Sequence, residues 1–246
     1  MEYRMYDTHM HLIPGVDDGA TDFNMAQSIL ETAMRQGICG IFATPHSSAF
    51  FQSPQDVMEN YILLRERIKR CCADFELYLG CEVYCEKSDM AEVLPALLTG
   101  RLPTLNGTKY VLTEYAPRAK KETVLYCAEK LLAAGFLPVI AHAERYYFLQ
   151  DNFYMVKKLK DMGCRIQINV YSVYEEHDAG IKACANRLVS EHLADFLGSD
   201  AHRTGHRPPC VETGLRYLYE IYEKTYIDRI ALENPRRLLT GQDFPA

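Results

Sequence analysis

The sequence predicts an α/β fold with parallel strands, and a closed or nearly closed barrel fits it best. A short unit recurs in which a helical stretch ends in glycine, a β-rich apolar run follows, and that run finishes on a polar residue. Strands and helices thus alternate along the chain without a low-complexity linker, as they do around parallel sheets. The length of 246 residues suits one such barrel, so a single domain over 1–246 is expected. An open doubly wound sheet stays an alternative.

Three of the expected strands follow glycine-ended helices. Glycine suits the left-handed position just past a helix end, and a continuous apolar run after it suits a buried parallel strand. The units are Met34-Arg35-Gln36-Gly37 before the run Ile38 to Thr44, Leu132-Ala133-Ala134-Gly135 before Phe136 to Ala141, and Lys160-Asp161-Met162-Gly163 before Cys164 to Asn169.

Four further runs bring the total to about seven strands. One helix between them has a start signal at Ser53-Pro54, with a capping serine and proline at the first position. Its apolar face continues at helical spacing through Val57, Tyr61, Leu64, Ile68 and Cys71. The four runs are Tyr3 to Asp7, Leu77 to Glu82, Tyr110 to Glu114 and Asp195 to Gly198.

The overall composition argues against several classes of partner. A net charge of -6 and a pI near 5.8 give no broad positive field for nucleic acid or anionic lipid. No apolar run approaches the roughly 18 residues of a membrane span, and the start Met1-Glu2-Tyr3-Arg4 lacks the apolar core of a signal peptide. The nine cysteines form no Cys-x-x-Cys pair and are interpreted as reduced packing residues. A cytoplasmic protein is therefore expected.

Residues of metal-ligand type stand where the expected strands finish. In parallel β/α folds the carboxyl ends of the strands meet at the active site, so residues far apart in sequence come together there. His9 and His11 are two apart, which places both imidazoles on one face of a strand, and Asp200-Ala201-His202 repeats that spacing. The residues at strand ends are His9, His11, His46, Glu82, Glu114, His142, Asn169, Asp200 and His202.

A cluster of this size predicts a site for divalent cations. A lone histidine such as His177 or His192 is ordinarily a surface side chain, and neither is assigned a role. Five histidines and three carboxylates at strand ends are different, because buried carboxylates are costly unless cations or hydrogen bonds compensate them. Nitrogen and oxygen donors suit manganese, iron or zinc. Neighbouring metals can activate a bridging water as hydroxide and clamp a phosphoryl oxygen, which predicts hydrolysis of a phosphate ester.

Two arginines beside these residues are candidates for holding the phosphate. Arg145 lies in Ala141-His142-Ala143-Glu144-Arg145, and Arg207 lies in His206-Arg207-Pro208-Pro209. Guanidinium groups match phosphate oxygens bidentately, although the spacing fits ordinary solvated or ion-paired arginines equally well. Arg203 is nearer Asp200 in sequence but ranks below both.

A different phosphatase chemistry is suggested by Cys210-x5-Arg216, which matches the loop spacing of cysteine-dependent phosphatases. A chain with nine cysteines produces such a match readily by chance. The stretch Val211 to Tyr222 also has the pattern of an amphipathic helix, not of a glycine-rich anion-binding loop. We therefore interpret the match as a coincidence.

Longer motifs run in order along essentially the whole chain. They are Asp7-Thr8-His9-Met10-His11, Val16-Asp17-Asp18-Gly19, Ala43-Thr44-Pro45-His46, Gly80-Cys81-Glu82-Val83, Ala141-His142-Ala143-Glu144-Arg145, Ser199-Asp200-Ala201-His202, Arg207-Pro208-Pro209 and Glu233-Asn234-Pro235-Arg236. Together they resemble the PHP (polymerase and histidinol phosphatase) superfamily. Within it they resemble the CpsB/CapC-type manganese-dependent protein-tyrosine phosphatases of Gram-positive capsule and exopolysaccharide loci. The Asp-Asp-Gly, His-x-Glu-Arg and Arg-Pro-Pro elements are more particular to this branch.

The resemblance implies a distorted (β/α)7 barrel of the PHP type, with two or three divalent cations, Mn²⁺ above all, at the carboxyl-terminal ends of its strands. Asp18 is preferred over its neighbour Asp17 as a ligand by alignment, and Arg145 and Arg207 match phosphate-binding arginines. The implied ligand sets are His9, His11, Glu82 and Asp200 for the first metal, Glu82, Glu114 and His142 for the second, with Glu82 bridging, and Asp18, His46 and His202 for the third.

The resemblance also implies a phosphotyrosine-bearing partner, namely the tyrosine-rich tail of a bacterial tyrosine kinase that controls polysaccharide assembly. Two alternatives remain. A small-molecule phosphatase of the same superfamily, acting on a substrate such as histidinol phosphate, would keep every ligand and change only the pocket. A non-catalytic PHP binding domain would commonly have lost ligands, whereas every ligand position that aligns here is filled.

Overall fold

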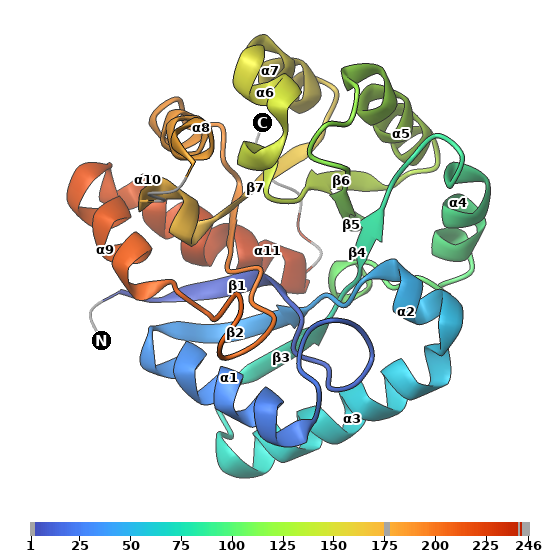
Figure 1. The fold of residues 1–246 in the computed structure, drawn as a ribbon, viewed down its shortest axis with the longest axis vertical. Coiled ribbons are helices and arrows are strands. Elements are labelled where there is room, and N and C mark those ends of the chain that lie inside the picture. Colours follow the sequence, from blue (N-terminus) through green and yellow to red (C-terminus); the bar gives the residue numbers. More distant parts are fainter. Residues whose placement is uncertain (1–2, 175–177, 241, 243–246) are drawn as a thin grey trace.

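The computed structural model describes residues 3–174, 178–240 and 242, and its strands lie at the centre with helices around them (Figure 1). The pairings between the named strands are all parallel. The expected α/β fold with parallel strands is therefore confirmed. The strands are β1 (Met5–Met10), β2 (Ile38–Ala43), β3 (Glu76–Leu79), β4 (Glu82–Tyr84), β5 (Tyr110–Glu114), β6 (Leu137–Ile140), β7 (Arg165–Asn169) and β8 (Phe196–Gly198).

Helices follow the strands along the chain and form the outside of the molecule. The α-helices are α1 (Phe23–Arg35), α2 (Ser47–Gln52), α3 (Pro54–Cys71), α4 (Met90–Leu98), α5 (Lys121–Ala133), α6 (Tyr147–Asp151), α7 (Tyr154–Asp161), α8 (Ala179–Ser190), α9 (Glu212–Ile221), α10 (Lys224–Asp228) and α11 (Asn234–Thr240). Short helical turns are η1 (Leu105–Gly107), η2 (Ala143–Arg145), η3 (Val170–Tyr174) and η4 (Arg229–Glu233).

The strands form two sheets, ordered β1-β2-β3 and β4-β5-β6-β7-β8, which touch at two seams. At one seam the Asp200 amide after β8 donates to the His9 carbonyl in β1 over 2.8 Å. At the other, the Glu82 amide of β4 donates to the Pro45 carbonyl after β2 over 3.0 Å. Residues expected at the metal site thus also lie where the two sheets meet.

One expected strand is wrong as a single element, because the run Leu77 to Glu82 forms β3 and β4. The chain changes its neighbour between them: β3 pairs with β2, and β4 pairs with β5. Gly80 lies at the break, where a Cβ would come within 2.8 Å of Leu105 Cδ2. A side chain at this position would therefore meet a residue of a distant turn, which no local sequence pattern indicates. The first expected strand, Tyr3 to Asp7, instead runs from Met5 to Met10.

The apolar core has two parts, one under the helices and a smaller one between the strands. Residues alternate between them along β5: Tyr110 and Leu112 join the smaller cluster, while Val111 packs in the larger one. This alternation directs the side chains of one strand face towards a common interior. The smaller cluster comprises Phe42, Leu105, Tyr110, Leu112, Val139, Ala141, Phe196 and Leu238.

The helix-end glycines behave as expected, since φ is 97° at Gly37, 87° at Gly135 and 105° at Gly163. The start of α3 is confirmed at Pro54, but the Ser53 side chain makes no capping hydrogen bond. Helix entry here therefore depends on the preset φ of proline and on the apolar face.

The cysteines are all free. Two expectations about them were wrong: Cys71 is exposed at the end of α3 instead of joining its apolar face, and Cys210 is exposed too. Among the described ranges, no helix has the length and apolar character needed to cross a membrane. The cysteines that are buried, as packing residues should be, are Cys81, Cys85, Cys127, Cys164 and Cys184.

Candidate metal centre

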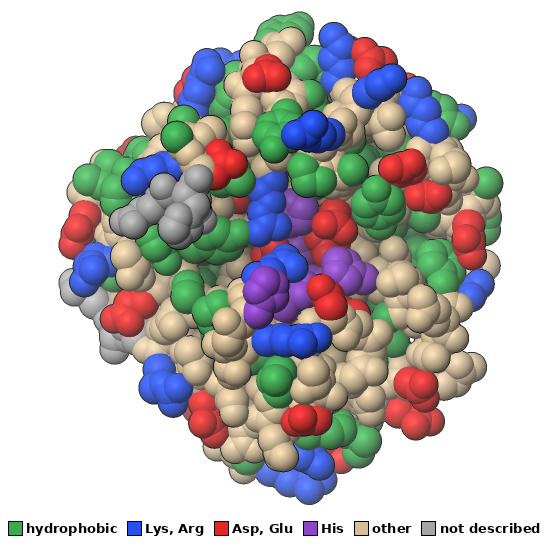
Figure 2. Space-filling model, viewed as in Figure 1, with side chains coloured by type: hydrophobic (Ala, Val, Ile, Leu, Met, Phe, Trp, Pro, Cys, Tyr) green, Lys and Arg blue, Asp and Glu red, His purple; other side chains and the backbone are tan. Residues whose placement is uncertain are grey.

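Histidine, acidic and basic side chains gather at the centre of one face of the molecule (Figure 2). This is the face at which the strands end, so the chain places its strand-end residues together as parallel topology requires. Each of the nine predicted ligands has a side-chain nitrogen or carboxylate oxygen within 3.8 Å of such an atom in another predicted ligand. They are His9 in β1, His11 after it, Asp18 in the next loop, His46 after β2, Glu82 at the start of β4, Glu114 at the end of β5, His142 after β6, and Asp200 and His202 after β8.

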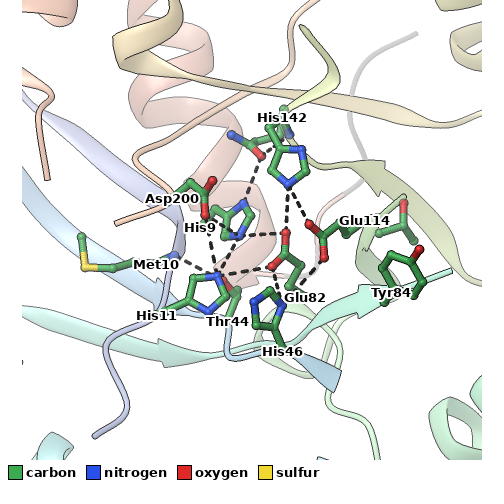
Figure 3. A network of polar contacts seen from close by, with 12 residues as sticks. His9, Met10, His11, Thr44, His46, Glu82, Tyr84, Glu114, His142 and Asp200 are labelled. Carbon is green, nitrogen blue, oxygen red and sulfur yellow. Dashed lines mark hydrogen bonds and ion pairs between the residues drawn. The ribbon is translucent and has the colours of Figure 1, made fainter. Parts of the chain in front are cut away.

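Glu82 is the centre of this network (Figure 3). Its Oε1 lies 3.1 Å from His9 Nε2 and 3.0 Å from His142 Nε2. Its Oε2 lies 3.3 Å from His11 Nε2 and 3.0 Å from His46 Nδ1. With its side chain 1% exposed, the carboxylate has imidazole nitrogens on both oxygens, as a bridging ligand between two cations would.

Among the residues that the structure describes, three overlapping groups of ligand atoms lie close enough to hold a cation, with all atoms of a group within 4.8 Å of one another. Only nitrogen and carboxylate oxygen donors occur in them, which suits manganese, iron or zinc. His11, His46 and Glu82 each belong to two groups. The groups are His9, His11 and Glu82; His46, Glu82 and Glu114; and His11, Asp18, His46 and His202.

The loop after β1 gives its two aspartates different positions. Asp18 Oδ1 lies 3.3 Å from both His46 Nε2 and His202 Nε2, so it faces the cluster. Asp17 instead lies behind His11, with Oδ2 at 2.8 Å from His11 Nδ1. A carboxylate on the far ring nitrogen fixes the tautomer and orientation of a ligand histidine. Gly19 brings the loop this close, because a Cβ there would lie 2.3 Å from the His11 carbonyl oxygen.

Asp200 has one oxygen bound by arginines and one without a hydrogen-bond partner. Arg145 Nη1 donates to Oδ2 over 2.8 Å and Arg207 Nη2 donates to it over 2.5 Å. Among the described residues, Oδ1 has no donor, although it is buried and lies 3.6 Å from His9 Nε2. A buried carboxylate oxygen needs a compensating partner, and a cation beside histidine nitrogens supplies one. The residues present therefore fit a metal.

The charges of the cluster shift the pKa values of its carboxylates. Burial alone would raise the pKa of Glu82, but the charge of His9 and hydrogen bonds from neighbouring histidines hold it well below its usual range. Burial acts the same way on Asp200, and the charges of His9 and Arg145 hold the pKa of this carboxyl well below normal. Both groups thus stay anionic and available to cations.

The pKa values of His11 and His142 shift upwards, whereas burial and the neighbouring charge of His11 lower the pKa of His202 to about 3. Burial opposes protonation of His11, yet hydrogen bonds to Asp17 and Glu82 raise its pKa to about 10. Burial likewise opposes protonation of His142, while hydrogen bonds to Glu114 and Glu82 raise its pKa to about 9. The concentrated negative charge of the cluster attracts positive charge. A divalent cation binding there would compete with these protons and release them.

Strained backbone also gathers at this site. φ is 32° at His142, 55° at Asp200 and 55° at Arg207, in the left-handed region that residues with a Cβ rarely adopt. Such residues cost on the order of 1 to 3 kcal/mol each and persist where the surrounding structure holds them. The Asp200 amide is held by the His9 carbonyl at 2.8 Å. The strain therefore accompanies side chains that must point into the cluster.

Two residues support Arg145 without having been predicted. The Tyr171 hydroxyl in η3 accepts a hydrogen bond from Arg145 Nη2. The fully buried Glu144 carboxylate accepts hydrogen bonds from the Asn169 backbone amide over 3.1 Å and from the Ser172 hydroxyl over 2.7 Å. These two bonds anchor the segment that carries Tyr171. Glu144 is part of the His-x-Glu-Arg motif, but no sequence pattern singled out Tyr171.

Cys210, Arg216 and His192 are not part of the three ligand groups. Cys210 precedes α9, and Arg216 is exposed on that helix, as the amphipathic pattern indicated. Arg203 Nε donates to the Asp18 carbonyl over 2.9 Å and so supports the ligand loop. His192 stacks on Tyr226, with ring centroids 4.2 Å apart, and His177 lies outside the described residues.

Comparisons with known proteins identify the family of this chain. The family model described as capsular polysaccharide synthesis, CpsB/CapC, matches residues 5–240. The tyrosine-protein phosphatase CpsB of Streptococcus pneumoniae is 30% identical over 245 residues, covering 97% of this chain and 99% of the relative. The tyrosine-protein phosphatase YwqE of Bacillus subtilis (strain 168) is 32% identical over 244 residues, covering 97% and 92%.

Solved structures extend the likeness to three dimensions. A chain from the crystal structures of YwqE from Bacillus subtilis and CpsB from Streptococcus pneumoniae, described as unique metal-dependent tyrosine phosphatases, superposes with a TM-score of 0.85. It is 29% identical, with 98% of this chain and 96% of that chain covered. The L-hydantoinase of Arthrobacter aurescens, 11% identical with a TM-score of 0.61 over 96% and 70% of the two chains, shares the fold alone. By its sequence over residues 5–240, the chain belongs to the CpsB/CapC family.

Proposed function

We propose that this chain is a metal-dependent protein-tyrosine phosphatase, which hydrolyses phosphotyrosine in a protein substrate. The observation that carries the proposal is the continuous network of histidines and carboxylates around Glu82, with two guanidinium groups on Asp200. Relatives that are named tyrosine-protein phosphatases, 30% and 32% identical over nearly the whole chain, support the choice of phosphotyrosine.

The proposed cofactor is Mn²⁺ in two or three sites, with iron and zinc as alternatives. Divalent cations would lower the pKa of a coordinated water and polarise the phosphoryl oxygens. Within the chain, Asp17 holds the His11 ring and Arg203 holds the loop of Asp18. The proposed ligands are His9, His11, Glu82 and Asp200 for the first site, Glu82, Glu114 and His142 for the second, and Asp18, His46 and His202 for the third.

We place the phosphoryl group of the substrate against Arg145 and Arg207. Their side chains are 22% and 32% exposed, so they reach both the buried Asp200 and the open face. Charged donors fixed at this place can neutralise the phosphate and the charge that builds on its oxygens during hydrolysis. In this proposal the two arginines act as catalytic residues, and Tyr171 helps to hold Arg145 in position.

Arg145→Ala and Arg207→Ala should each weaken transition-state binding by about 2 to 4 kcal/mol, as lost charge-stabilising donors do. The measurement is kcat/KM on a phosphotyrosine peptide at saturating Mn²⁺. Arg216→Ala is the matched control, because that arginine is exposed on α9 and should leave kcat/KM unchanged. Normal kcat/KM in both site variants would remove the arginines from the proposed mechanism.

Aryl phosphates are the expected substrates because of the leaving group. A tyrosine phenol has a pKa near 10, so it departs with modest help, whereas the alkoxide of phosphoserine needs a positioned acid or a metal on its oxygen. The histidines at the strand ends are occupied by the carboxylate network, and His206 is exposed in the loop before Arg207. The site therefore favours an ester that needs little protonation of its leaving group.

The test is kcat/KM for a phosphotyrosine peptide, its phosphoserine counterpart and histidinol phosphate at one Mn²⁺ concentration. The phosphotyrosine peptide should lead by at least about tenfold, a transition-state difference near 1.4 kcal/mol. If histidinol phosphate leads, the protein is a small-molecule phosphatase and the tyrosine-phosphatase proposal is wrong. If no ester is hydrolysed by the metal-loaded protein, a non-catalytic binding domain is the better account.

The proposed partner is the tyrosine-rich tail of a bacterial tyrosine kinase that controls capsular or exopolysaccharide synthesis. The family description, capsular polysaccharide synthesis, supports this setting. A cytoplasmic location belongs to the same proposal, since nine free cysteines suit a reducing compartment.

We further propose one domain over 1–246 with a distorted (β/α)7 barrel, in which β3 and β4 are halves of one strand broken at Gly80-Cys81. The seams from Asp200 to His9 and from Glu82 to Pro45 support this arrangement. A common cluster of side chains from β2, β5, β6 and β8 supports it too.

A further inference from the structure

Two amide side chains of β7, Gln167 and Asn169, lie directly behind the candidate metal centre. Both are fully buried, and being two residues apart on a strand they share one face. Their neighbours Ile166 and Ile168 pack in the large apolar cluster under the helices. A buried amide needs hydrogen-bond partners, and those of Gln167 and Asn169 are, apart from each other, residues of the metal centre.

One backbone group fixes the orientation of the Gln167 amide. The His142 backbone amide donates to Gln167 Oε1 over 2.8 Å, and because an N–H can only donate, the atom facing it must be oxygen. The same Oε1 lies 3.4 Å from His9 Nδ1. Since a carbonyl oxygen only accepts, a hydrogen bond between these two atoms requires a proton on His9 Nδ1. In the neutral ring that binds a cation, the lone pair of His9 Nε2 is then directed at the cluster, 3.1 Å from Glu82 Oε1.

The orientation of the Gln167 amide also determines the orientation of the Asn169 amide. Gln167 Nε2 donates to Asn169 Oδ1 over 3.0 Å, which leaves Asn169 Nδ2 to donate to Asp200 Oδ2 over 3.3 Å. This third donor adds to the two arginines on Oδ2, so Oδ1 is the oxygen left for the histidine side of the cluster. Gly198 makes room for this arrangement, because a Cβ there would lie 2.7 Å from Gln167 Nε2.

We propose that Gln167 and Asn169 are positioning residues that set the His9 tautomer, hold the left-handed turn at His142 and leave Asp200 Oδ1 for a cation. This inference rests on the metal centre of the proposed function and deepens it. Groups that orient metal ligands in this way typically change metal affinity by about 10- to 100-fold when removed. We call the hydrogen bonds that run from the His142 backbone amide through Gln167 and Asn169 to Asp200 the relay. It predicts that changing Gln167 or Asn169 lowers metal affinity, although neither residue is a proposed metal ligand.

Gln167→Met tests the relay, because methionine keeps the length of the side chain and loses both hydrogen-bonding ends. The dissociation constant of Mn²⁺, measured by titrating metal-depleted protein, should rise about 10- to 100-fold. Asn186→Leu is the matched control: its amide on α8 bonds the Val173 carbonyl at 2.8 Å and the Tyr222 hydroxyl at 2.7 Å, away from the metal centre. That variant should lose thermal stability and keep its affinity for Mn²⁺.

A spectroscopic measurement covers the case in which Gln167→Met does not fold. In zinc-loaded wild-type protein with ¹⁵N-labelled histidine, the His9 resonances, assigned with a His9→Ala variant, should show the proton on Nδ1. A proton on Nε2, or a Gln167→Met dissociation constant within about twofold of the wild type, contradicts the relay. If either result is found and the wild-type protein still binds metal, the relay is wrong and the proposed function is not contradicted. A wild-type protein that binds no metal contradicts both.

Discussion

Replacing Glu82 by glutamine is expected to lower kcat/KM for a phosphotyrosine peptide by at least about three orders of magnitude. The two carboxylate oxygens face the nitrogens of four histidines, within 3.0 to 3.3 Å. Glutamine keeps the size of the side chain, but it removes the negative charge and turns an NH₂ group towards the other ligands. A bridging position cannot be filled by that group, because a cation needs a lone pair there.

Two control variants make this prediction specific. Glu76→Gln changes the same residue type at the start of β3, where Glu76 is exposed and bonds Tyr6, and it should leave turnover unchanged. Cys210→Ser removes the thiol of the alternative phosphatase motif and should also keep near-normal turnover. A folded but inactive Cys210→Ser protein would show that a thiolate is the nucleophile. Near-normal turnover in Glu82→Gln would contradict a bridging role for Glu82.

Removing the metal is the second change with a large expected effect. Chelation should abolish turnover, and Mn²⁺ should restore it better than other divalent cations. Stability should change in the same direction, because metal that binds the folded chain and not the unfolded one stabilises the folded state. At a hundredfold excess over the dissociation constant the gain is about 2.7 kcal/mol, which corresponds to a rise in Tm on the order of 5 to 10 °C for a chain of this size.

Glu82→Gln provides the control for this stability effect. Mn²⁺ should raise the Tm of this variant less than that of the wild type, since the variant changes the carboxylate that belongs to two of the three ligand groups. A Tm of the wild type that does not respond to any divalent cation, measured by differential scanning calorimetry, would contradict a metal centre in the folded protein.

The gathering of ligands could be predicted from the sequence because a parallel sheet brings its strand ends together. Gly37, Gly135 and Gly163 mark the ends of three helices, and a parallel strand follows each of them. The polar residues at the ends of these strands are therefore expected on the same face of the molecule. Residues as distant as His9 and Asp200 meet for that reason, with 3.6 Å between Nε2 and Oδ1. The choice of Asp18 over Asp17 as a ligand came from alignment and stays a prediction, with Asp18 Oδ1 3.3 Å from His46 Nε2.

Other features could not be predicted, because they depend on which distant residues meet. At the break between β3 and β4, Gly80 lies against Leu105, a residue in a later turn. Asn169 was noted as a strand-end residue, but its role depends on the direction of the Gln167 amide, which the His142 backbone sets. Tyr171 contacts Arg145 from a separate segment, with no motif to mark it. The periodicity of apolar residues reports on neighbours along the chain and carries no information about these distant contacts.

The central claim is that phosphotyrosine hydrolysis depends on cations held by the cluster around Glu82. The most direct test titrates metal-depleted protein with Mn²⁺ and measures, on the same samples, bound metal by elemental analysis and turnover of a phosphotyrosine peptide. Turnover should be absent without metal and rise in proportion to bound metal until two or three equivalents are bound. Full turnover in protein shown by elemental analysis to be free of metal would contradict the claim.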